Sequence, residues 1–256
     1  MKISIVTITY NNFSELKYTL DSIPDYDFIE SVVINGGDCQ QTKELLESYK
    51  GKSISEKDSG IADAFNKGIQ LASGDFIMFL NSGDVFIDAN YLMKAWNYFT
   101  FNSEIDFVHA NLILRNSDGT ELYMRPTFSN LGRGMPYLHP TMIFRKSVFD
   151  KVGYFNTKYK IAMDFDFIVR LEKAKLKGYY FKESFPVRME GTGRSISNEA
   201  EALRECFSIL RDNNLLDLKN FFGYTQRYLL FLGRKLLKAS GQDELLLKLK
   251  KYKHHV

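Results

Sequence analysis

The chain has 256 residues, of which 45% are apolar and 25% charged, a balance typical of a globular protein with a substantial core. A net charge of +3 gives no indication of a nucleic-acid partner. The charge is uneven, because the segment from Lys219 onward holds nine Lys or Arg and two Asp or Glu. This segment therefore carries +7 and the remainder −4, so a mildly acidic body precedes a basic tail.

Cys39 and Cys206 are the two cysteines, and without a C-x-x-C pair they predict neither a disulfide framework nor a zinc site. Such cysteine usage favours a reducing, cytoplasmic setting. The apolar start, MKISIVTITYNN, is too short for a signal peptide and favours a first strand. Because no apolar run approaches the ~18 residues that span a bilayer, we expect a protein that does not cross a membrane.

The first 85 residues alternate between strand and helix patterns. Asn12, with Glu15 three residues later, is a candidate N-cap for the first helix. The pattern predicts strands at residues 3–8, 31–34, 53–56 and 76–80, and helices at residues 13–23, 42–49 and 61–72. Strands separated by helices imply right-handed crossovers and a parallel sheet covered on both faces.

After residue 85 the pattern changes. It predicts a helix at 89–99, a hairpin of strands at 107–114 and 121–125 around the turn NSDG, a strand at 141–145, a helix at 161–175 and a strand at 187–190. A glycine-bracketed loop, GTGRS, follows at residues 191–195 and is of the kind that can move.

Three of the predicted strands in the first half end in polar residues. These are residues 10–12 (YNN), 35–37 (NGG) and 81–84 (NSGD). The carboxyl ends of parallel strands meet at one rim of a sheet, where ligands bind in open α/β folds. Three polar strand ends at one rim favour a binding site over three unrelated turns.

Several familiar chemistries are excluded. No G-x-G-x-x-G follows the first strand, and Gly51-Lys52-Ser53 follows a helix and lacks the preceding glycine of a phosphate-binding loop. Two of the four histidines end the chain, so a histidine-built site is poorly supplied. The remaining candidates are carboxylates, namely Asp58, Asp63, Asp84, Asp164 and Asp166.

Four stretches of the chain carry a family resemblance. ISIVTITYNN, VVINGGDCQQT and SEKDSGIADAFNKGIQLASGDFIMFLNSGD resemble the nucleotide-binding half of family 2 glycosyltransferases, and HPTMIFRKSVFDKVGYFNTKYKIAMDFDFIVRL resembles their acceptor-side half. The resemblance covers roughly residues 1–195. It is closest to the subgroup that makes bacterial exopolysaccharide or lipopolysaccharide, which similarly has SExDxGIxDAxNKGI and LNSGD.

The resemblance implies an α/β fold of the GT-A type, with a mixed, mainly parallel central sheet and a C-terminal helical extension. Residues 1–218 would form the glycosyltransferase domain, divided into a nucleotide-sugar-binding half (1–85) and an acceptor-side half (86–218). Residues 219–256 would form a basic, amphipathic helical tail.

The resemblance also implies a divalent cation, Mn²⁺ or Mg²⁺, on the diphosphate of a nucleotide-sugar. The family normally holds it through D-x-D or D-D after the strand, and here NSGD leaves Asp84 as the metal ligand. Asn81 and Gly83 fall in the same nucleotide-binding segment, with Gly83 where the family has an acid. One carboxylate, two phosphate oxygens and waters are enough for such an ion.

The nucleotide itself is expected to be UDP. Asn35 stands where many members have an acid that reads the uracil and ribose, and Asp58 is expected to accept a hydrogen bond from the base. Thr9 and Tyr10 resemble the residues that flank the base. Arg194, in the glycine-bracketed loop, either closes over the diphosphate or is a solvated cation.

The catalytic base is expected from the second half. Family members have an acidic pair at the start of a helix, and Met163-Asp164 occupies that place, so Asp164 would act alone. A single base suits an inverting reaction, in which the acceptor hydroxyl attacks the anomeric carbon in line. The alternative is that Asp164 caps its helix. Asp166 lies on another helical face, and a structural role is favoured for His139.

The function implied is an inverting, metal-dependent glycosyltransferase that uses a nucleotide-sugar to extend a saccharide or a lipid-linked saccharide of the cell surface. One alternative is a catalytically inactive module that binds a nucleotide-sugar or saccharide, since several family acids are replaced. Another is a sugar nucleotidyltransferase, which is disfavoured because TYNNFSE holds neither a glycine nor a basic residue.

The basic tail has apolar residues near helical spacing, at positions 228, 229, 232, 236 and 237, among Arg227, Arg234, Lys235 and Lys238. This pattern predicts an interfacial helix that docks on the anionic inner face of the cell membrane. The alternative is a helix that packs on the catalytic domain or on a partner subunit, as in a homodimer.

Asp63 and Lys67 have the spacing of an ordinary helix ion pair.

Overall fold

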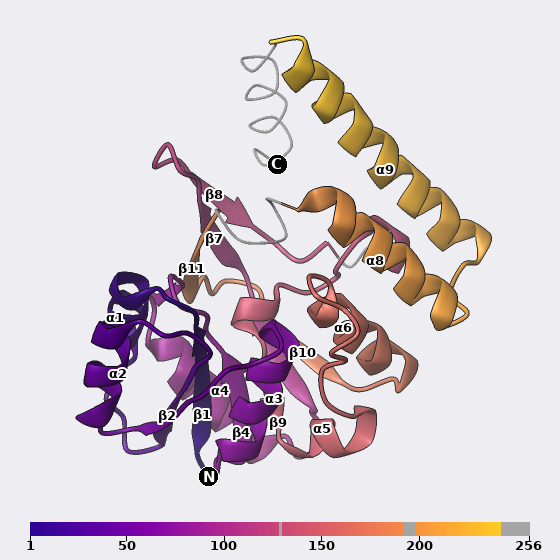
Figure 1. Ribbon diagram of the computed structural model, residues 1–256. Coiled ribbons are helices and arrows are strands. Elements are labelled where there is room, and N and C mark those ends of the chain that lie inside the picture. The colour runs from indigo at the N-terminus through magenta and orange to yellow at the C-terminus, as the bar shows by residue number, and fades with distance from the viewer. Residues whose placement is uncertain (128–129, 192–197, 242–256) are drawn as a thin grey trace.

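The computed structural model describes residues 1–127, 130–191 and 198–241. Its centre is a seven-stranded sheet in the order β10-β6-β9-β4-β1-β2-β3, with helices on both faces (Figure 1). The strands are β1 (Ile3–Thr9), β2 (Ile29–Asn35), β3 (Lys52–Ser55), β4 (Phe76–Phe79), β6 (Phe107–Ala110), β9 (Ile143–Arg145) and β10 (Gly178–Phe181).

The first half of the chain forms the parallel part of this sheet. β1 lies between β2 and β4 and runs parallel to both, with Thr9 opposite Asn35 at the end of the ladder. The first polar strand end and the second therefore lie side by side, as the sequence predicts. The β-branched residues of β1 are buried on both faces, which suits a strand that is covered on both sides.

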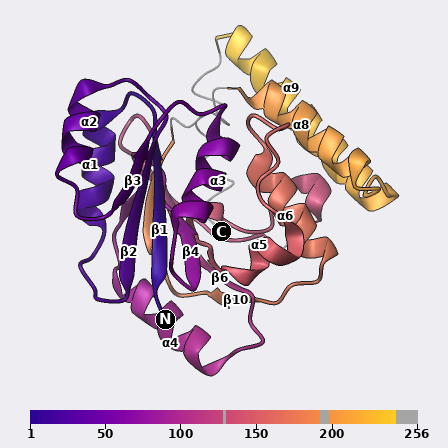
Figure 2. The same cartoon turned by 60° about the horizontal axis from the view of Figure 1, so that its bottom comes forward.

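Three helices cover this parallel part, namely α1 (Phe13–Ser22), α2 (Gln40–Glu47) and α3 (Ile61–Leu71). Leu16 and Leu46 bury themselves against Val33 on one face, whereas α3 packs on the other face (Figure 2). A Cβ on Gly68 would meet Val6 Cγ1 at 2.2 Å, so α3 approaches β1 closely only because residue 68 is glycine. Asn12 occupies the N-cap position of α1, but its amide donates to the Glu15 carboxylate and makes no cap hydrogen bond.

The second half of the chain completes the same sheet. β9 runs antiparallel to both β4 and β6, and β10 is parallel to β6. The sheet is therefore mixed and mainly parallel, which confirms the expected fold class. The helices α4 (Asn90–Phe101), α5 (Ser147–Val152) and α6 (Met163–Lys173) cover this part.

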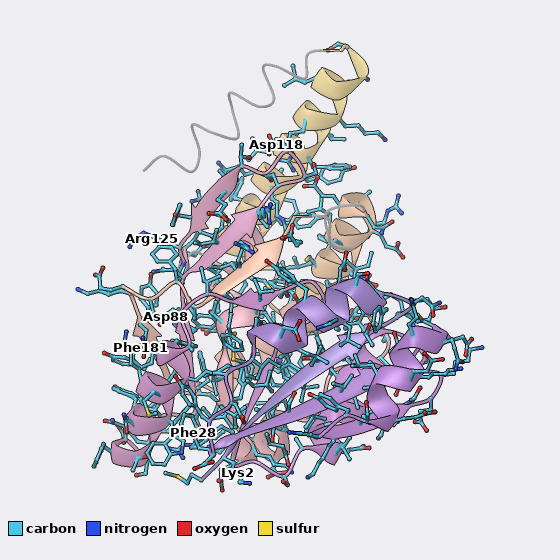
Figure 3. All side chains as sticks on the ribbon, turned by 90° about the vertical axis from the view of Figure 1, so that its left-hand side faces the viewer. Lys2, Phe28, Asp88, Asp118, Arg125 and Phe181 are labelled. Carbon is cyan, nitrogen blue, oxygen red and sulfur yellow. The ribbon has the colours of Figure 1, made fainter. Side chains whose placement is uncertain are left out.

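A second, smaller sheet has the order β5-β11-β7-β8. Its strands are β5 (Val85–Phe86), β11 (Val187–Glu190), β7 (Leu112–Arg115) and β8 (Glu121–Met124). β7 and β8 form the predicted hairpin, with Leu112 opposite Met124. Figure 3 shows its turn, at Asp118, at the end of the molecule remote from Lys2 and the start of β1.

Two predicted strands differ in the structure. The strand expected at 107–114 is divided into β6 and β7 at Asn111, whose buried side chain donates to the Lys182 carbonyl (2.7 Å) while its backbone N–H donates to Ser184 (3.0 Å). The chain thereby leaves one sheet and enters the other. The start of the strand expected at 141–145 is a 3₁₀ turn, η2 (His139–Thr141), because the Thr141 hydroxyl bonds the Ala110 and Leu138 carbonyls.

The C-terminal helices of the described part are α8 (Glu199–Asp212) and α9 (Leu218–Ala239), and their presence confirms the expected helical extension. α9 falls in the extension predicted at residues 219–256, whereas α8 falls within residues 86–218. α9 packs on η1 (Leu131–Arg133) and on α8. The Asn220 side chain accepts the Gly132 N–H at 3.0 Å, and a Cβ on Gly132 would meet the Asn220 carbonyl oxygen at 2.0 Å. Within the described residues, no helix has the length and apolar character needed to cross a bilayer.

Candidate active site

A cavity of about 800 Å³ opens at the carboxyl ends of β1 and β4. Its wall comes from five segments, which are residues 8–12, 58–64, 81–82, 160–161 and the start of α8. Four predicted site residues line it, namely Thr9, Tyr10, Asp58 and Asn81. Asn35, Gly83, Asp84 and Asp164 do not line it, and Arg194 lies outside the described residues.

Three buried polar atoms at this rim have no hydrogen-bond partner within the described residues. They are Thr9 Oγ1, Asn81 Oδ1 and Ser82 Oγ, and all three residues line the cavity. Buried polar atoms in folded proteins are nearly always paired, so this set indicates a polar ligand as the missing partner. Ser82 was not among the residues predicted from the sequence, although it lies inside the NSGD segment.

The carboxylate of Asp58 is fixed beside the β2 strand end. Asp58 Oδ1 accepts the Gly60 N–H at 3.0 Å, and a Cβ on Gly36 would meet Asp58 Oδ2 at 1.7 Å. Glycine at position 36 therefore makes room for this carboxylate. The geometry leaves Asp58 as the acid at this part of the cavity wall.

Asn35 shapes this strand end from within. Its side chain is fully buried, and its amide donates to the Ser55 hydroxyl (2.9 Å) and the Gly37 carbonyl (3.2 Å). Its Oδ1 accepts the Gly37 N–H at 3.0 Å. Because these bonds occupy both ends of the amide, Asn35 acts on the shape of the turn at residues 35–37 and not directly on the cavity.

Asp84 lies behind the cavity wall and is 5% exposed. Gly83 reaches a φ of 101°, a conformation that favours glycine, and its N–H donates to the Thr19 hydroxyl at 2.9 Å. Burial raises the pKa of the Asp84 carboxyl to about 7, although hydrogen bonds from the backbone N–H groups of Glu190 and Asn81 lower it.

The oxygen atoms at this strand end suit a hard divalent cation. Asp84 offers a carboxylate, and the unpaired Asn81 Oδ1 and Ser82 Oγ lie in the same turn. Within the described residues no group of three or more His, Cys, Asp or Glu could hold a metal by itself. A cation here would therefore need oxygen atoms from a bound ligand and from water to complete its coordination.

Asp164 lies in the first turn of α6, where its Oδ1 accepts the Phe165 N–H at 2.7 Å. Burial raises the pKa of its carboxyl to about 6, while the backbone N–H of Phe165 and the charge of Arg227 lower it. Its own loop, through Lys160 and Ile161, lines the cavity. Asp164 therefore borders the cavity through this loop and does not enter its wall.

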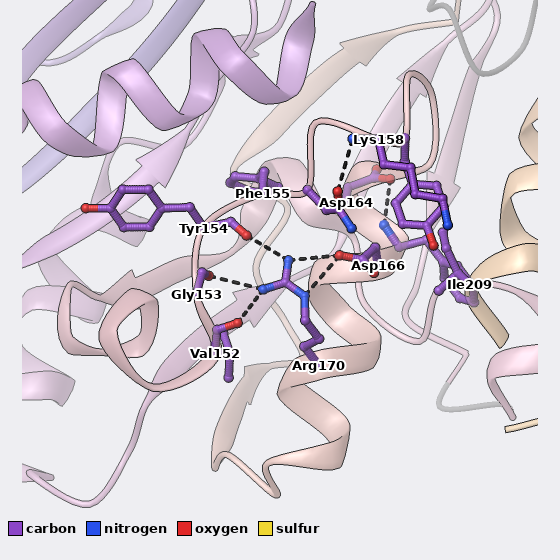
Figure 4. A network of polar contacts seen from close by, with 12 residues as sticks. Val152, Gly153, Tyr154, Phe155, Lys158, Asp164, Asp166, Arg170 and Ile209 are labelled. Carbon is purple, nitrogen blue, oxygen red and sulfur yellow. Dashed lines mark hydrogen bonds and ion pairs between the residues drawn. The ribbon is translucent and has the colours of Figure 1, made fainter. Parts of the chain in front are cut away.

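The neighbouring acid, Asp166, points elsewhere, as the sequence predicts. It forms an ion pair with Arg170 at 2.9 Å, and the Arg170 guanidinium also donates to the carbonyls of Val152, Gly153 and Tyr154 (Figure 4). This network ties α6 to the end of α5. Its role is to fix the helix that carries Asp164.

A second anchor for that loop comes from α8 and was missed at the level of the sequence. The Glu205 carboxylate accepts three backbone N–H groups, from Lys160 (2.8 Å), Ile161 (2.9 Å) and Ala162 (2.7 Å). No motif marks Glu205, because its partners lie more than 40 residues earlier in the chain. Arg227 of α9, whose Nη1 lies 3.7 Å from Cys206 Sγ, was likewise not placed near Asp164.

Two further candidates, His139 and Asp63, have contacts that indicate structural roles. His139 is 5% exposed and stacks on Phe79 with ring centroids 5.6 Å apart, and burial lowers its pKa to about 4. Asp63 accepts the Ser59 N–H at 2.8 Å, while Lys67 pairs more closely with Glu56 (2.8 Å) than with Asp63 (3.9 Å). Neither His139 nor Asp63 lines the cavity.

A mixed sheet with a polar cavity at the carboxyl ends of its central strands matches the GT-A fold that the sequence resemblance implies. A model of the glycosyl transferase family 2 matches residues 4–169, which is more than half of the chain. The chain therefore belongs to glycosyl transferase family 2 and is a glycosyltransferase.

The curated relatives that the chain resembles are also named as glycosyltransferases. A PGL/p-HBAD biosynthesis glycosyltransferase of Mycobacterium bovis is 26% identical over an alignment of 181 residues that covers 65% of this chain and 68% of that protein. The uncharacterized glycosyltransferase YwdF of Bacillus subtilis is 28% identical over 188 residues, 68% of this chain and 69% of that protein.

Solved structures share the fold. S. aureus TarS 1–349 in complex with UDP-GlcNAc has a TM-score of 0.66 at 18% identity, covering 89% of this chain and 72% of that one. The mannosyltransferase PcManGT from Pyrobaculum calidifontis, in complex with GDP-Man and Mn²⁺, has a TM-score of 0.62 at 14% identity, covering 96% and 80%. At these identities the likeness establishes the GT-A fold alone.

Proposed function

We propose that this chain is a metal-dependent, inverting glycosyltransferase that moves a sugar from a nucleotide-sugar to a saccharide or lipid-linked saccharide in cell-surface polysaccharide synthesis. The observation that carries the proposal is the set of oxygen atoms of Thr9, Asn81 and Ser82 that are unpaired within the described residues and share one cavity. The Asp58 carboxylate lies in the wall of this cavity, and the loop that leads to Asp164 lines it. A nucleotide-sugar offers both hydrogen-bond donors and phosphate oxygens to such a cavity.

The donor is proposed to lie across the carboxyl ends of β1 and β4. Thr9, Tyr10 and Asp58 would face the base and ribose, with Asn35 shaping the turn beside them. Asn81 and Ser82 would face the sugar diphosphate, and Gly83, which does not line the cavity, would act on it through the shape of their turn. Uracil is favoured because the TarS structure holds UDP-GlcNAc, although PcManGT holds GDP-Man. Arg194 stays a proposed diphosphate ligand outside the described residues.

The transfer step needs one base and one leaving group. The Asp164 carboxylate takes the proton of the acceptor hydroxyl as its oxygen bonds to the anomeric carbon, and the bond from that carbon to the diphosphate breaks with its electron pair on the diphosphate. Attack from the opposite side inverts the configuration. A bound Mn²⁺ or Mg²⁺, held by Asp84 with Asn81 and Ser82, would neutralise charge on the departing diphosphate.

The setting proposed for this reaction is the cytoplasm, at the inner face of the cell membrane, where a lipid-linked acceptor would be available. The M. bovis relative is named for PGL/p-HBAD biosynthesis, which supports a role in glycan assembly of the exopolysaccharide or lipopolysaccharide kind. The division into residues 1–85, 86–218 and 219–256 and a homodimer remain proposals.

The replacement of acidic residues that the family normally has favours a second candidate function. This function is that of an inactive module that binds a nucleotide-sugar or saccharide. Asn35, Gly83 and Met163 stand where the family has acids. Such a module would bind the donor and transfer nothing. A nucleotidyltransferase has less support, because the segment after β1 holds neither a glycine nor a basic residue before Lys17.

A thermal-stability screen with UDP- and GDP-sugars, with and without Mn²⁺, tests the donor site. A ligand at about 100 times its Kd stabilises the folded state by about 2.7 kcal/mol. We expect one nucleotide class to raise the melting temperature and Mn²⁺ to increase the effect. Asp84→Asn should lose the Mn²⁺-dependent part, whereas Asp88→Asn, outside the site, should keep it. Absence of stabilisation by every nucleotide-sugar would contradict the proposal.

A further inference from the structure

The outward face of α9 is apolar. Leu218 (77% exposed), Phe222 (67%), Leu229 (61%) and Leu236 (71%) are spaced by four and seven residues, which places them on one face of the helix. Phe221, Tyr228 and Leu230 are also exposed on α9. We call these seven residues the α9 stripe. A contiguous apolar surface of this kind marks an interaction site in a soluble protein.

The polar side of α9 faces the protein. Asn220 is 7% exposed and binds Gly132, and Arg227 contacts Cys206. Arg234 forms an ion pair with Glu199 of α8. A helix that only completes a fold turns its apolar face inward, and here the apolar residues of the stripe point outward. Packing on the body therefore explains the inner face of α9 and leaves the stripe uncovered within the described residues.

The charge of α9 decides what can cover the stripe. The helix holds Lys219, Arg227, Arg234, Lys235 and Lys238 and has no Asp or Glu. At 100° per residue Lys219 and Lys235 lie on opposite sides of the line formed by Leu218, Phe222, Leu229 and Leu236, and both are exposed. A second copy of the same helix would bring like charges together, whereas anionic lipid headgroups match these lysines while acyl chains accept the stripe.

We infer that the α9 stripe docks the protein on an anionic bilayer surface. In Figure 1, α9 lies toward the end of the molecule at which β1 and β4 reach the cavity, away from the amino terminus. The inference rests on the proposed function in one respect, namely that docking on the bilayer would bring a lipid-linked acceptor within reach of the site.

The test is flotation of the full chain with phosphatidylcholine vesicles, with and without phosphatidylglycerol, and with no nucleotide-sugar present. Wild type should float with the anionic vesicles only. Leu229→Glu combined with Leu236→Glu should weaken binding about tenfold or more, since both leucines leave the acyl region. Lys219→Gln combined with Lys235→Gln should weaken binding several-fold. Phe101→Glu, at an exposed phenylalanine of α4, is the matched control and should bind as wild type does.

Three outcomes would overturn the inference. One is equal binding to neutral and anionic vesicles, or unchanged binding by the double glutamate variant with its melting temperature intact. The second is a wild-type dimer that becomes a monomer in that variant without vesicle binding, which would assign the stripe to a second copy. The third is binding only after removal of residues 242–256, which would show that this segment covers the stripe. Because donor binding plays no part in flotation, failure here leaves the proposed function standing.

Discussion

The residue on which the proposed chemistry depends is Asp164, a half-buried residue in the first turn of α6. Burial raises its pKa to about 6, and the positive charge of Arg227 opposes this rise. A carboxyl in this position is ionised at neutral pH and is a stronger base than an exposed aspartate. The charge of Arg227 thereby connects the base electrostatically to the C-terminal helix.

These shifts predict the pH dependence of the reaction. A general base works in its deprotonated form, so kcat should fall as the pH falls through about 6. Arg227→Gln removes a charge that lowers the pKa of Asp164. The acidic limb of the plot of kcat against pH should therefore move to higher pH. Arg227→Lys should keep the limb close to that of wild type, as should Lys235→Gln on the exposed side of α9. A limb that stays in place in Arg227→Gln would contradict the coupling.

At the scale of elements, α8 holds the loop that leads into α6. The three N–H groups of residues 160–162 all donate to Glu205, and the same loop lines the cavity through Lys160 and Ile161. Hydrogen bonds to a charged group are about twice as strong as neutral ones. Glu205 is therefore a positioning residue, which acts on the site through the loop.

Glu205→Ala should release this loop. We expect a loss of about 1.5–3 kcal/mol in the free energy of unfolding, the usual range for a hydrogen bond to a charged group. The fall in kcat should exceed the change in donor KM, because the loop carries Asp164 while the donor cavity rests mainly on β1 and β4. Glu205→Gln should recover part of both losses, and Arg204→Ala, exposed on the same helix, should cause neither. A kcat equal to that of wild type in Glu205→Ala would contradict the positioning role of Glu205.

The elements also show what the sequence could predict. Helix α3 and strands β1 to β4 follow local periodicity, and Thr9, Tyr10, Asp58 and Asn81 reach the cavity because the ends of parallel strands share a rim. The break at Asn111 depends on carbonyls of residues 182 and 184, which no local pattern reveals. Glu205 and Arg227 escaped prediction for the same reason, since tertiary packing alone brings α8 and α9 to α6.

At the scale of the whole molecule, α9 belongs both to the body and to its outer surface. Its inner side binds Gly132 through Asn220 and approaches Asp164 through Arg227, while its stripe faces outward. The sequence predicts the basic tail either as a membrane helix or as a helix packed on the protein. The first alternative remains a proposal, and the second describes the contacts with η1 and α8.

Truncation at two positions separates these roles. A chain ending at Leu218 should lose vesicle binding, and it should also melt at a lower temperature and lose activity, because Asn220 and Arg227 go with it. A chain ending at Gly241 keeps all of α9 and should retain stability and activity. Equal melting temperatures for the two truncated chains, measured by circular dichroism, would show that α9 contributes nothing to the body.

The central claim is that Asp164 is the base of a glycosyl transfer whose donor site is built by the first half of the chain. The measurement is kcat for transfer beside Kd for the nucleoside diphosphate with Mn²⁺, in wild type and Asp164→Asn. Removal of a positioned base costs about 10²–10⁴-fold in rate. We predict that fall in kcat with Kd unchanged, because Asp164 does not line the donor cavity. A kcat within a few-fold of wild type, or a change in Kd alone, would contradict the account.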